Sequence, residues 1–204
     1  MLLEAKDISF SYQKGKPILN HVDLKIQSGE RVALVGPSGC GKSTLSQILS
    51  GLLSPSSGEV LLDKKPLPEK GYCPVQLIYQ HPEKAVNPRW KLQKTLMEAW
   101  SPDDSFLREI GIQKEWMSRY PIELSGGELQ RFCIVRALGP KTKFIIADEI
   151  STMLDVITQA QIWNLILEMV NQRDLGLLVV THNLALAQKI CTRTVIFEEC
   201  NHKR

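Results

Sequence analysis

Apolar and polar positions alternate along parts of the chain and form short apolar runs in others, and both patterns predict strands. Segments 2–12 and 22–27 alternate, and we expect 2–12 to lie at the edge of a sheet. The run 31–36 is almost wholly apolar, as is typical of a strand that is covered on both faces. Further strands are predicted at 58–63, 75–80, 143–148, 175–182 and 192–199.

Helical periodicity predicts helices in the stretches between these strands. Strands that alternate with helices predict an α/β domain with a largely parallel sheet. The helices are expected at 42–49, at 125–138 (ended by Gly139 and Pro140), at 154–172 and at 183–190. In the helix 154–172 the apolar residues that fall near one face are Ile157, Ile162, Leu165, Ile166 and Met169.

The stretch 91–120 differs from the rest because it is helical in pattern and rich in tryptophan. We therefore predict a single domain, 1–204, that carries a helical insertion at about 85–137. Its tryptophans could line a groove for a helix of a partner, or they could form the small core of the insertion. For any single tryptophan the core is the commoner role.

Composition excludes several classes of function. The chain of 204 residues is 43% hydrophobic, and its net charge of +3 is too small to predict a nucleic-acid partner. Five cysteines, none in a C-x-x-C pair, argue against a disulfide framework or a zinc site. Without a signal peptide or a membrane-spanning run, the protein is expected in the cytoplasm, at a membrane only through a partner. Residues 201–204 are polar and expected to fray.

A glycine-rich loop follows the run 31–36 and opens the helix 42–49. It matches G-x-x-x-x-G-K-[ST], in which backbone N–H groups bind nucleotide phosphates. Lys42 is expected to reach the β- and γ-phosphates, and Ser43 to bind Mg²⁺. The motif alone predicts only a nucleotide phosphate, because kinases, GTPases and motor ATPases share it. The residues of this phosphate loop are Gly36, Pro37, Ser38, Gly39, Cys40, Gly41, Lys42, Ser43 and Thr44.

Two carboxylates end the apolar strand predicted at 143–148. Asp148, at the end of the strand, fits the role of a Walker-B aspartate toward Mg²⁺. Glu149 is then placed to orient or deprotonate an attacking water. A polar strand end that merely begins a loop would look the same, but its combination with the phosphate loop favours the functional interpretation.

The turn at 124–128 raises a question, because a helix predicted to begin at Ser125 contains two glycines. Ser125 and Glu128 stand at the S-x-x-E spacing of a capping box. Gly126 and Gly127 would each weaken the interior of a helix by about 0.5–1 kcal/mol relative to alanine. A capping box explains Ser125 and Glu128 but not both glycines, so we expect that something approaches this backbone closely.

Together, "GPSGCGKST" (36–44), "LSGGELQR" (124–131) and "FIIADE" (144–149) resemble the ATP-binding-cassette (ABC) family of ATPases, over essentially the whole chain. The resemblance implies a P-loop NTPase (RecA-like) core with a mainly parallel sheet, an N-terminal antiparallel β subdomain and a helical insertion subdomain. It implies ATP and Mg²⁺ as ligands. It also implies that two cassettes pair head to tail, so that the turn 124–128 of one closes on the ATP held by the other.

The resemblance assigns roles to four further residues. Tyr12 matches an aromatic residue that stacks on adenine, and Gln80 matches a glutamine that senses Mg²⁺ and γ-phosphate and touches the transport subunit. His182 matches a histidine that contacts the γ-phosphate. Asp155 matches an aspartate in a loop between the two ATP sites, where Met153 departs from the usual alanine. Taken alone, Tyr12 would more often serve in packing and His182 would more often be structural, and a lone glutamine such as Gln80 would mean little.

A finer resemblance begins at Gln80. The segment "QHPEKAVNPRW" (80–90) looks like the ATPase subunits of bacterial peptide and nickel importers, and most like the nickel type. It implies a subunit that hydrolyses ATP to power an importer of nickel, metal chelates or peptides. The expected partners are a second ATPase subunit, which in such importers is often a different chain, and integral membrane permease subunits. An extracytoplasmic solute-binding protein would take part indirectly, and the subunit would lie peripherally on the cytoplasmic face of the membrane.

Three alternatives are weighed at this point. A structural or regulatory cassette would bind ATP without turnover, but intact Lys42, Asp148, Glu149 and His182 argue against it. An exporter subunit would carry the same motifs, because direction is set largely by the permease. A soluble ABC ATPase acting on DNA or the ribosome would usually show coiled coils, zinc modules or tandem cassettes, which this sequence lacks. Importer subunits of this kind usually continue well beyond the last strand, so a sequence that stops at Arg204 is expected to be either a minimal cassette or one that lacks regulatory and dimer-stabilising elements.

Overall fold

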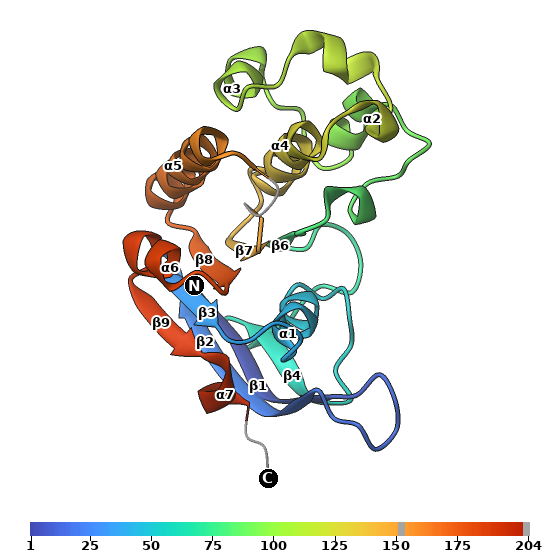
Figure 1. The fold of residues 1–204 in the computed structure, drawn as a ribbon. Helices are drawn as coiled ribbons and strands as arrows, with labels where there is room; N and C mark the ends of the chain where they lie inside the picture. The colour runs from blue at the N-terminus through green and yellow to red at the C-terminus, as the bar shows by residue number, and fades with distance from the viewer. Residues whose placement is uncertain (151–153, 202–204) are drawn as a thin grey trace.

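Two sheets and a set of helices make up the molecule (Figure 1). The computed structural model describes residues 1–150 and 154–201. The strands are β1 (Leu2–Phe10), β2 (Leu19–Gln27), β3 (Arg31–Val35), β4 (Ser57–Leu62), β5 (Lys65–Pro66), β6 (Val75–Ile78), β7 (Phe144–Asp148), β8 (Gly176–Thr181) and β9 (Arg193–Ile196). The α-helices are α1 (Lys42–Leu49), α2 (Leu92–Met97), α3 (Asp104–Glu109), α4 (Gly126–Ala137), α5 (Val156–Arg173), α6 (Leu184–Ile190) and α7 (Phe197–Cys200). Short 3-10 helices are η1 (Pro82–Lys84), η2 (Lys114–Ser118) and η3 (Pro121–Glu123).

The larger sheet is parallel and has the strand order β6-β7-β8-β3-β9. Because its strands are parallel, the carboxyl ends of β6, β7, β8 and β3 share one edge, and polar residues that follow these strands meet there. The predicted α/β class with a mainly parallel sheet is confirmed.

The smaller sheet is antiparallel and has the order β2-β1-β4-β5. The prediction that 2–12 forms an edge strand is wrong, since β1 pairs with β2 on one side and with β4 on the other. Alternation of apolar residues reports which face of a strand is buried, and it carries no information about whether both edges are paired.

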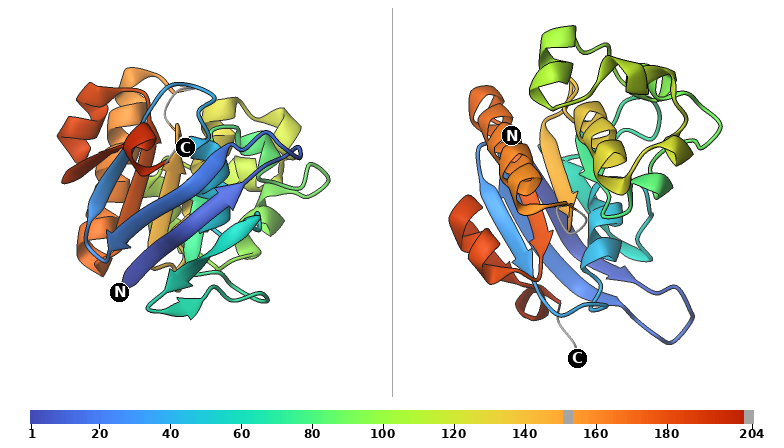
Figure 2. Two further views of the ribbon diagram at one scale, coloured as in Figure 1. Left: turned by 90° about the horizontal axis from the view of Figure 1, so that it is seen from below. Right: turned by 45° about the horizontal axis from the view of Figure 1, so that its top comes forward.

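Alternate residues of the parallel strands enter two separate cores. Phe144 and Ile146 of β7 join an apolar cluster that lies between the two sheets and includes α1. Ile145 and Ala147 point the other way, into a cluster with α4, α5 and the insertion helices. From below, the antiparallel strands lie across the parallel ones (Figure 2, left). Both faces of the parallel sheet are therefore covered, which explains the unbroken apolar runs in its sequence.

Every element that the structure describes between β6 and β7 is helical, in line with the periodicity of 91–120. Trp116 is only 7% exposed and belongs to the core, and Trp100 donates its indole N–H to the carbonyl oxygen of Val135 at 2.9 Å. The core role, rather than a docking groove, therefore applies to Trp116. The bounds 85–137 of the insertion stay a prediction.

The long helix α5 buries most of the face that was predicted for it, including Ile162, Leu165 and Ile166. Ile157 is an exception, because it is 72% exposed. It lies in the first turn of the helix, next to the N-cap Asp155.

The end of the chain differs from prediction in two ways. The strand expected at 192–199 stops at Ile196, and residues 197–200 form α7, whose Phe197 is buried behind the phosphate loop. Asn201 was expected to fray but is 4% exposed, with its side chain bonded to the N–H of Asn20 at 2.8 Å and to the carbonyl of Ile18 at 3.1 Å. Residues 202–204, which were also expected to fray, lie outside the described residues.

Candidate functional site

The phosphate loop connects β3, which lies between β8 and β9 in the parallel sheet, to α1. Gly41 caps α1 with φ 118°, a conformation that side chains rarely allow. A Cβ atom there would lie 2.8 Å from a methyl group of Ile18 and 3.1 Å from the ring of Phe197. The loop is thus packed against the β1–β2 connection and α7, and only glycine fits at this position.

Lys42 turns its ammonium group back into the phosphate loop. Nζ donates to the carbonyl oxygens of Gly36 at 2.8 Å and Pro37 at 2.7 Å, and it lies 3.8 Å from the thiol of Cys40. The side chain is buried, so these carbonyls take the place of water around its charge. Phosphate oxygens are also hydrogen-bond acceptors, and because they carry negative charge they bind an ammonium group more strongly than neutral carbonyls do.

Asp148 ends β7 as a buried carboxylate. Burial raises the pKa of Asp148, against a hydrogen bond from the Ser43 hydroxyl and the positive charge of Lys42, which both lower it. Its Oδ1 has no hydrogen-bond partner among the described residues. An orphaned carboxylate oxygen beside a hydroxyl fits a hydrated Mg²⁺ ion, because such ions bind through one or two carboxylates and keep several waters.

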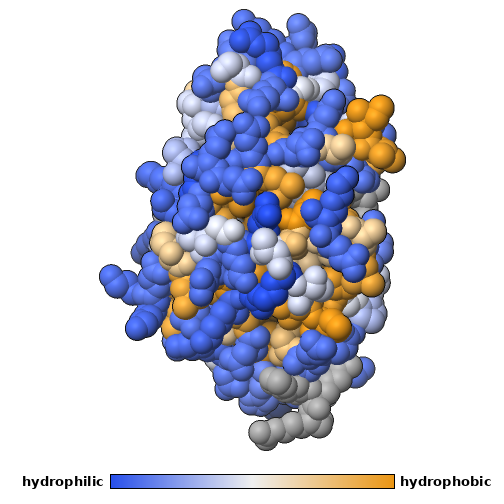
Figure 3. Space-filling model, turned by 90° about the vertical axis from the view of Figure 1, so that its left-hand side faces the viewer, coloured by the Kyte–Doolittle hydropathy of each residue, from blue (hydrophilic) through white to orange (hydrophobic). Residues whose placement is uncertain are grey.

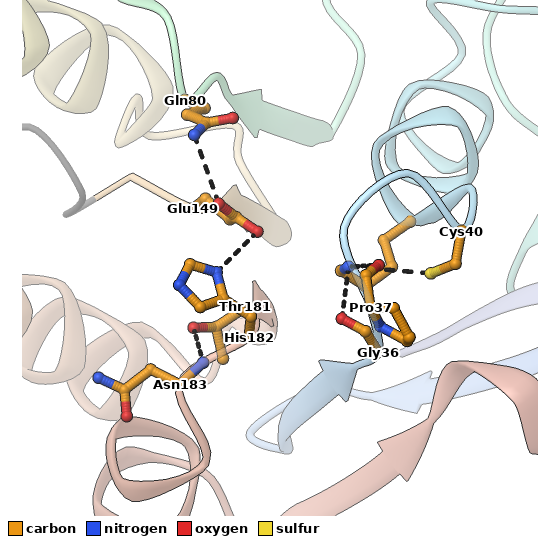
Figure 4. Close-up of polar contacts among 9 residues, drawn as sticks. Gly36, Pro37, Cys40, Gln80, Glu149, Thr181, His182 and Asn183 are labelled. Atoms are coloured by element: carbon orange, nitrogen blue, oxygen red, sulfur yellow. Dashed lines mark hydrogen bonds and ion pairs between the residues drawn. The ribbon is translucent and has the colours of Figure 1, made fainter.

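Glu149 follows in a strained conformation, with φ 49°. Its backbone N–H donates to the carbonyl of Val180 at 3.0 Å, which fixes the turn. Its carboxylate accepts from the Gln80 amide at 3.3 Å and lies 3.2 Å from Nδ1 of His182 (Figure 4). Gln80 and His182, which the family resemblance singled out, therefore meet at the carboxylate of Glu149.

The neighbours of Glu149 come from the two flanking strand ends. Gln80 follows β6, and His182 follows β8 directly. Behind His182 the N–H of Asn183 donates to the Thr181 hydroxyl at 3.0 Å, and the Asn183 side chain caps α6. The His182 side chain is more than half exposed, so an approaching ligand can reach it.

Tyr12 is 60% exposed and stands beside the phosphate loop. Its ring meets Phe10 edge-on with centroids 4.8 Å apart, and its hydroxyl lies 3.4 Å from Oγ1 of Thr44. Tyr12 lines a hollow of about 400 Å³, called here the phosphate-loop hollow, together with Lys42, Ser43, Gln80 and Glu149. Ile18 also lines this hollow but was missed in the sequence, because its place depends on how the β1–β2 connection folds back. Ser38, Gly39, Gly41 and Thr44 line it as well, whereas Cys40 packs its side chain against the core between the sheets.

The helix α4 begins as the capping box predicts. Oγ of Ser125 accepts from the N–H of Glu128 at 3.3 Å, and Oε2 of Glu128 accepts from the N–H of Ser125 at 2.7 Å. The bond from the Ser125 backbone lowers the pKa of Glu128. Ser125 and Gly126 are exposed, while Gly127 is half-buried.

A second hollow, of about 590 Å³, opens beside this turn and is called here the signature hollow. Ser125, Gly127, Arg131 and Asp155 are among the residues that line it. It shares no residue with the phosphate-loop hollow in the described part of the chain. The two groups of predicted site residues are therefore not brought together within one chain.

Asp155 has a clear structural role as the N-cap of α5. Its carboxylate accepts from the N–H groups of Ile157 at 3.1 Å and Thr158 at 3.0 Å. The hydrogen bond from the Thr158 side chain, with these backbone bonds, lowers the pKa of Asp155. Met153, where the sequence departs from the family pattern, lies outside the described residues.

Comparison with known proteins decides the family. Residues 19–152 match the sequence profile of the family described as "ABC transporter". This chain belongs to the ABC transporter family. It binds and hydrolyses ATP, as the resemblance of its motifs predicted. None of the helices in residues 1–150 and 154–201 is long and apolar enough to cross a membrane.

Relatives within the ABC transporter family include proteins named for nickel import. The chain is 33% identical to "Nickel import ATP-binding protein NikE" of Escherichia coli O6:K15:H31 (strain 536 / UPEC), covering 97% of this chain and 84% of that protein. It is 31% identical to "Nickel import system ATP-binding protein NikE" of Staphylococcus aureus (strain MSSA476), covering 97% and 87%. The likeness to nickel-type subunits that was predicted from residues 80–90 is confirmed.

Solved structures confirm the P-loop ATPase fold. The dimeric, post-hydrolysis structure of the ATP-binding cassette MJ0796 bound to ADP and Pi aligns with a TM-score of 0.81 at 24% identity, over 99% of this chain and 97% of that one. A structure described as the ATP binding subunit of an ABC transporter aligns with a TM-score of 0.78 at 27% identity, over 96% and 85%.

Proposed function

We propose that this chain is the ATP-hydrolysing subunit of a membrane importer, and that the cargo is nickel or a nickel chelate. In a peptide importer the chain would have the same role, and only the cargo would differ. The observation that carries it is the likeness, over 97% of this chain, to proteins named for nickel import in Escherichia coli and Staphylococcus aureus. The meeting of Gln80, Glu149 and His182 beside the phosphate loop supports turnover, rather than passive binding of ATP.

ATP would lie in the phosphate-loop hollow, with its adenine on Tyr12 and its phosphates at residues 36–44. Ser43, Asp148 and Gln80 would hold Mg²⁺, which supplies positive charge to the transferred phosphoryl group. Glu149 would accept the proton of the attacking water. Gln80 and His182 support that role because their bonds to the carboxylate fix its direction, and His182 is exposed enough to reach the γ-phosphate.

A second ATPase subunit is supported by the separation of the two hollows, since a composite site needs a phosphate loop and a turn 124–128 from different chains. Exposed apolar residues flank both regions. Val156 and Ile157, beside the signature hollow, are 80% and 72% exposed, and Leu184 near His182 is exposed as well. Apolar side chains also reach the surface on the face that carries α5 and α6 (Figure 3). A head-to-tail partner, identical or different, would cover them.

Coupling to transport would run through permease subunits that dock on the insertion and on the segment after Gln80. A solute-binding protein outside the membrane would deliver the cargo. The chain itself would then lie peripherally on the cytoplasmic face of the membrane, with no nucleic acid among its partners.

Purification of the tagged chain from native membranes in mild detergent, followed by mass spectrometry, tests this assignment. A permease pair together with a second ATPase subunit is the expected result, and cells that lack the chain should accumulate less nickel from trace medium. Recovery from the soluble fraction alone, or with ribosomes or nucleic acid, would overturn the importer assignment while leaving the ATP site intact. Nickel uptake that is unchanged, with a peptide-binding protein in the complex, would move the cargo to peptides.

The catalytic assignment has its own test in Glu149→Gln. The amide keeps the size of the side chain but cannot take a proton, so turnover should fall by at least about 100-fold. ATP binding should persist, and the variant should accumulate as an ATP-bound dimer in size-exclusion chromatography. Lys42→Ala is the matched control, which should lose ATP affinity instead. Turnover that survives in Glu149→Gln would remove Glu149 from the role of general base.

A further inference from the structure

The helix α4 carries an amide on its buried face. Gln130 is 2% exposed, and the buried residues around it on the helix, such as Leu129, Phe132 and Ile134, are apolar. Burying an amide among apolar side chains is unfavourable unless its polar atoms find partners. Leucine or methionine would fill this space without that cost, so the bonds that Gln130 makes are informative.

Gln130 makes one such bond, and it reaches the strand end that carries Gln80. Nε2 of Gln130 donates to the carbonyl oxygen of Tyr79 at 3.0 Å. Tyr79 lies just beyond β6, whose last pair with β7 joins Ile78 to Ala147. The carbonyl of Tyr79 therefore lies beyond the backbone pairing of β6 with β7. It accepts a hydrogen bond from the Gln130 side chain instead.

The oxygen of the Gln130 amide differs from its nitrogen in its hydrogen bonding. Oε1 of Gln130 is buried and has no hydrogen-bond partner in the described part of the chain. A buried oxygen without a partner lowers stability, so the side chain is poorly suited to a purely structural task. The contribution of Gln130 therefore lies in the position it gives to Tyr79.

The position of Tyr79 connects residues at both hollows. Gln80 follows Tyr79 and donates its amide to the carboxylate of Glu149 at 3.3 Å. Gln130 itself lies between one and two helical turns from Ser125, at the start of the same rigid helix. A single bond thus joins the helix that begins at the signature hollow to Tyr79, the residue just before Gln80, which contacts Glu149 beside the phosphate-loop hollow.

We propose that Gln130 is a positioning residue that ties the start of α4 to the turn at Tyr79 and thereby holds Gln80 against Glu149. When a partner's nucleotide moves the turn 124–128, Gln130 carries that displacement to Tyr79 and Gln80. This proposal rests on the roles proposed above for Gln80 and Glu149.

A double-mutant cycle in the full chain tests it, with Gln130→Met, Gln80→Ala and the pair. Methionine keeps the length of the side chain and removes both amide atoms, including the unpartnered oxygen, so the unfolding midpoint should stay near that of the parent. Loss of the bond to Tyr79 should lower kcat by about tenfold and leave KM for ATP within about twofold. In the Gln80→Ala background, Gln130→Met should lower kcat no further, because the residue it acts through is gone.

Leu129→Met is the matched control, since it changes an adjacent buried side chain of α4 that makes no polar contact, and its kcat should equal that of the parent. Unchanged kcat in Gln130→Met, or a loss of stability without a loss of kcat, would show that the amide only satisfies a carbonyl. Effects of Gln130→Met and Gln80→Ala that multiply in the double variant would equally overturn the proposal. If Gln80→Ala alone has no effect on kcat, the proposed role of Gln80 fails first, and the positioning role falls with it.

Discussion

Replacing Gly127 by alanine should separate the stability of this chain from its activity. Gly127 lies in the first turn of α4 and does not belong to the glycines with positive φ. An added Cβ would meet Cδ2 of Leu154 at 3.0 Å, which is the far end of a flexible side chain. Leu154 can move by a few tenths of an ångström at small cost, and alanine gains about 0.5–1 kcal/mol over glycine inside a helix. We therefore expect the free energy of unfolding of Gly127→Ala to stay within about 1 kcal/mol of the parent.

Activity should behave differently, because the added methyl group lies on the half-exposed turn where the partner's γ-phosphate is proposed to approach. Backbone N–H groups stabilise a phosphate only at hydrogen-bonding distance, near 3 Å. Removing one such preorganised donor from a reacting group typically lowers kcat by about 10²–10³. A loss of kcat of at least about 100-fold is expected on that basis.

Urea unfolding and steady-state ATP turnover of the same preparations measure the two quantities. Gly71→Ala is the opposite control: φ of Gly71 is 87° with open space around it, so alanine there should cost stability and leave kcat unchanged. Parental kcat in Gly127→Ala would refute the close approach of a ligand to this backbone. A large loss of stability would refute the reasoning about Leu154.

Two further predictions concern the phosphate loop and the cap of α4. Gly41→Ala combines φ 118° with a contact of 2.8 Å to Ile18, and it should lose about 2–4 kcal/mol of unfolding free energy. Gly39→Ala, at φ 78° with nothing within 4 Å, should lose about 1 kcal/mol; equal losses in urea titrations would contradict the packing of the loop against Ile18 and Phe197. Because the backbone N–H of Ser125 lowers the pKa of Glu128, the stability from that carboxylate is present above its ordinary pKa of 4.5 and is lost as the pH falls through the lowered value. Glu128→Gln should therefore flatten the fall in urea midpoint between about pH 5 and pH 3, and an unaltered slope would count against the capping box.

Local sequence patterns predicted the helices and strands well where a single local feature, such as a glycine-rich loop or an unbroken apolar run, determines the structure. The helix expected at 42–49 begins at Lys42 and ends at Leu49, because a glycine-rich loop precedes it and Gly51 follows it. The apolar runs became strands of the parallel sheet since both of its faces are covered. Residues 197–199 were expected to continue a strand, but they belong to α7, where Phe197 fills the space behind the phosphate loop. That space is created by residues far away in the sequence, so periodicity could not reveal it.

The site residues were found one by one in the sequence, but their meeting depends on the order of the strands in space. Gln80 and Glu149 are 69 positions apart, and Glu149 and His182 are 33 apart. They meet because the parallel sheet runs β6-β7-β8, with β3 inserted between β8 and β9 rather than in sequence order. The positive φ of Glu149 then points its carboxylate at both neighbours. Neither the strand order nor a strained glutamate leaves a trace in local hydrophobicity, which is also why the bond from Gln130 to Tyr79 could only be found in the folded chain.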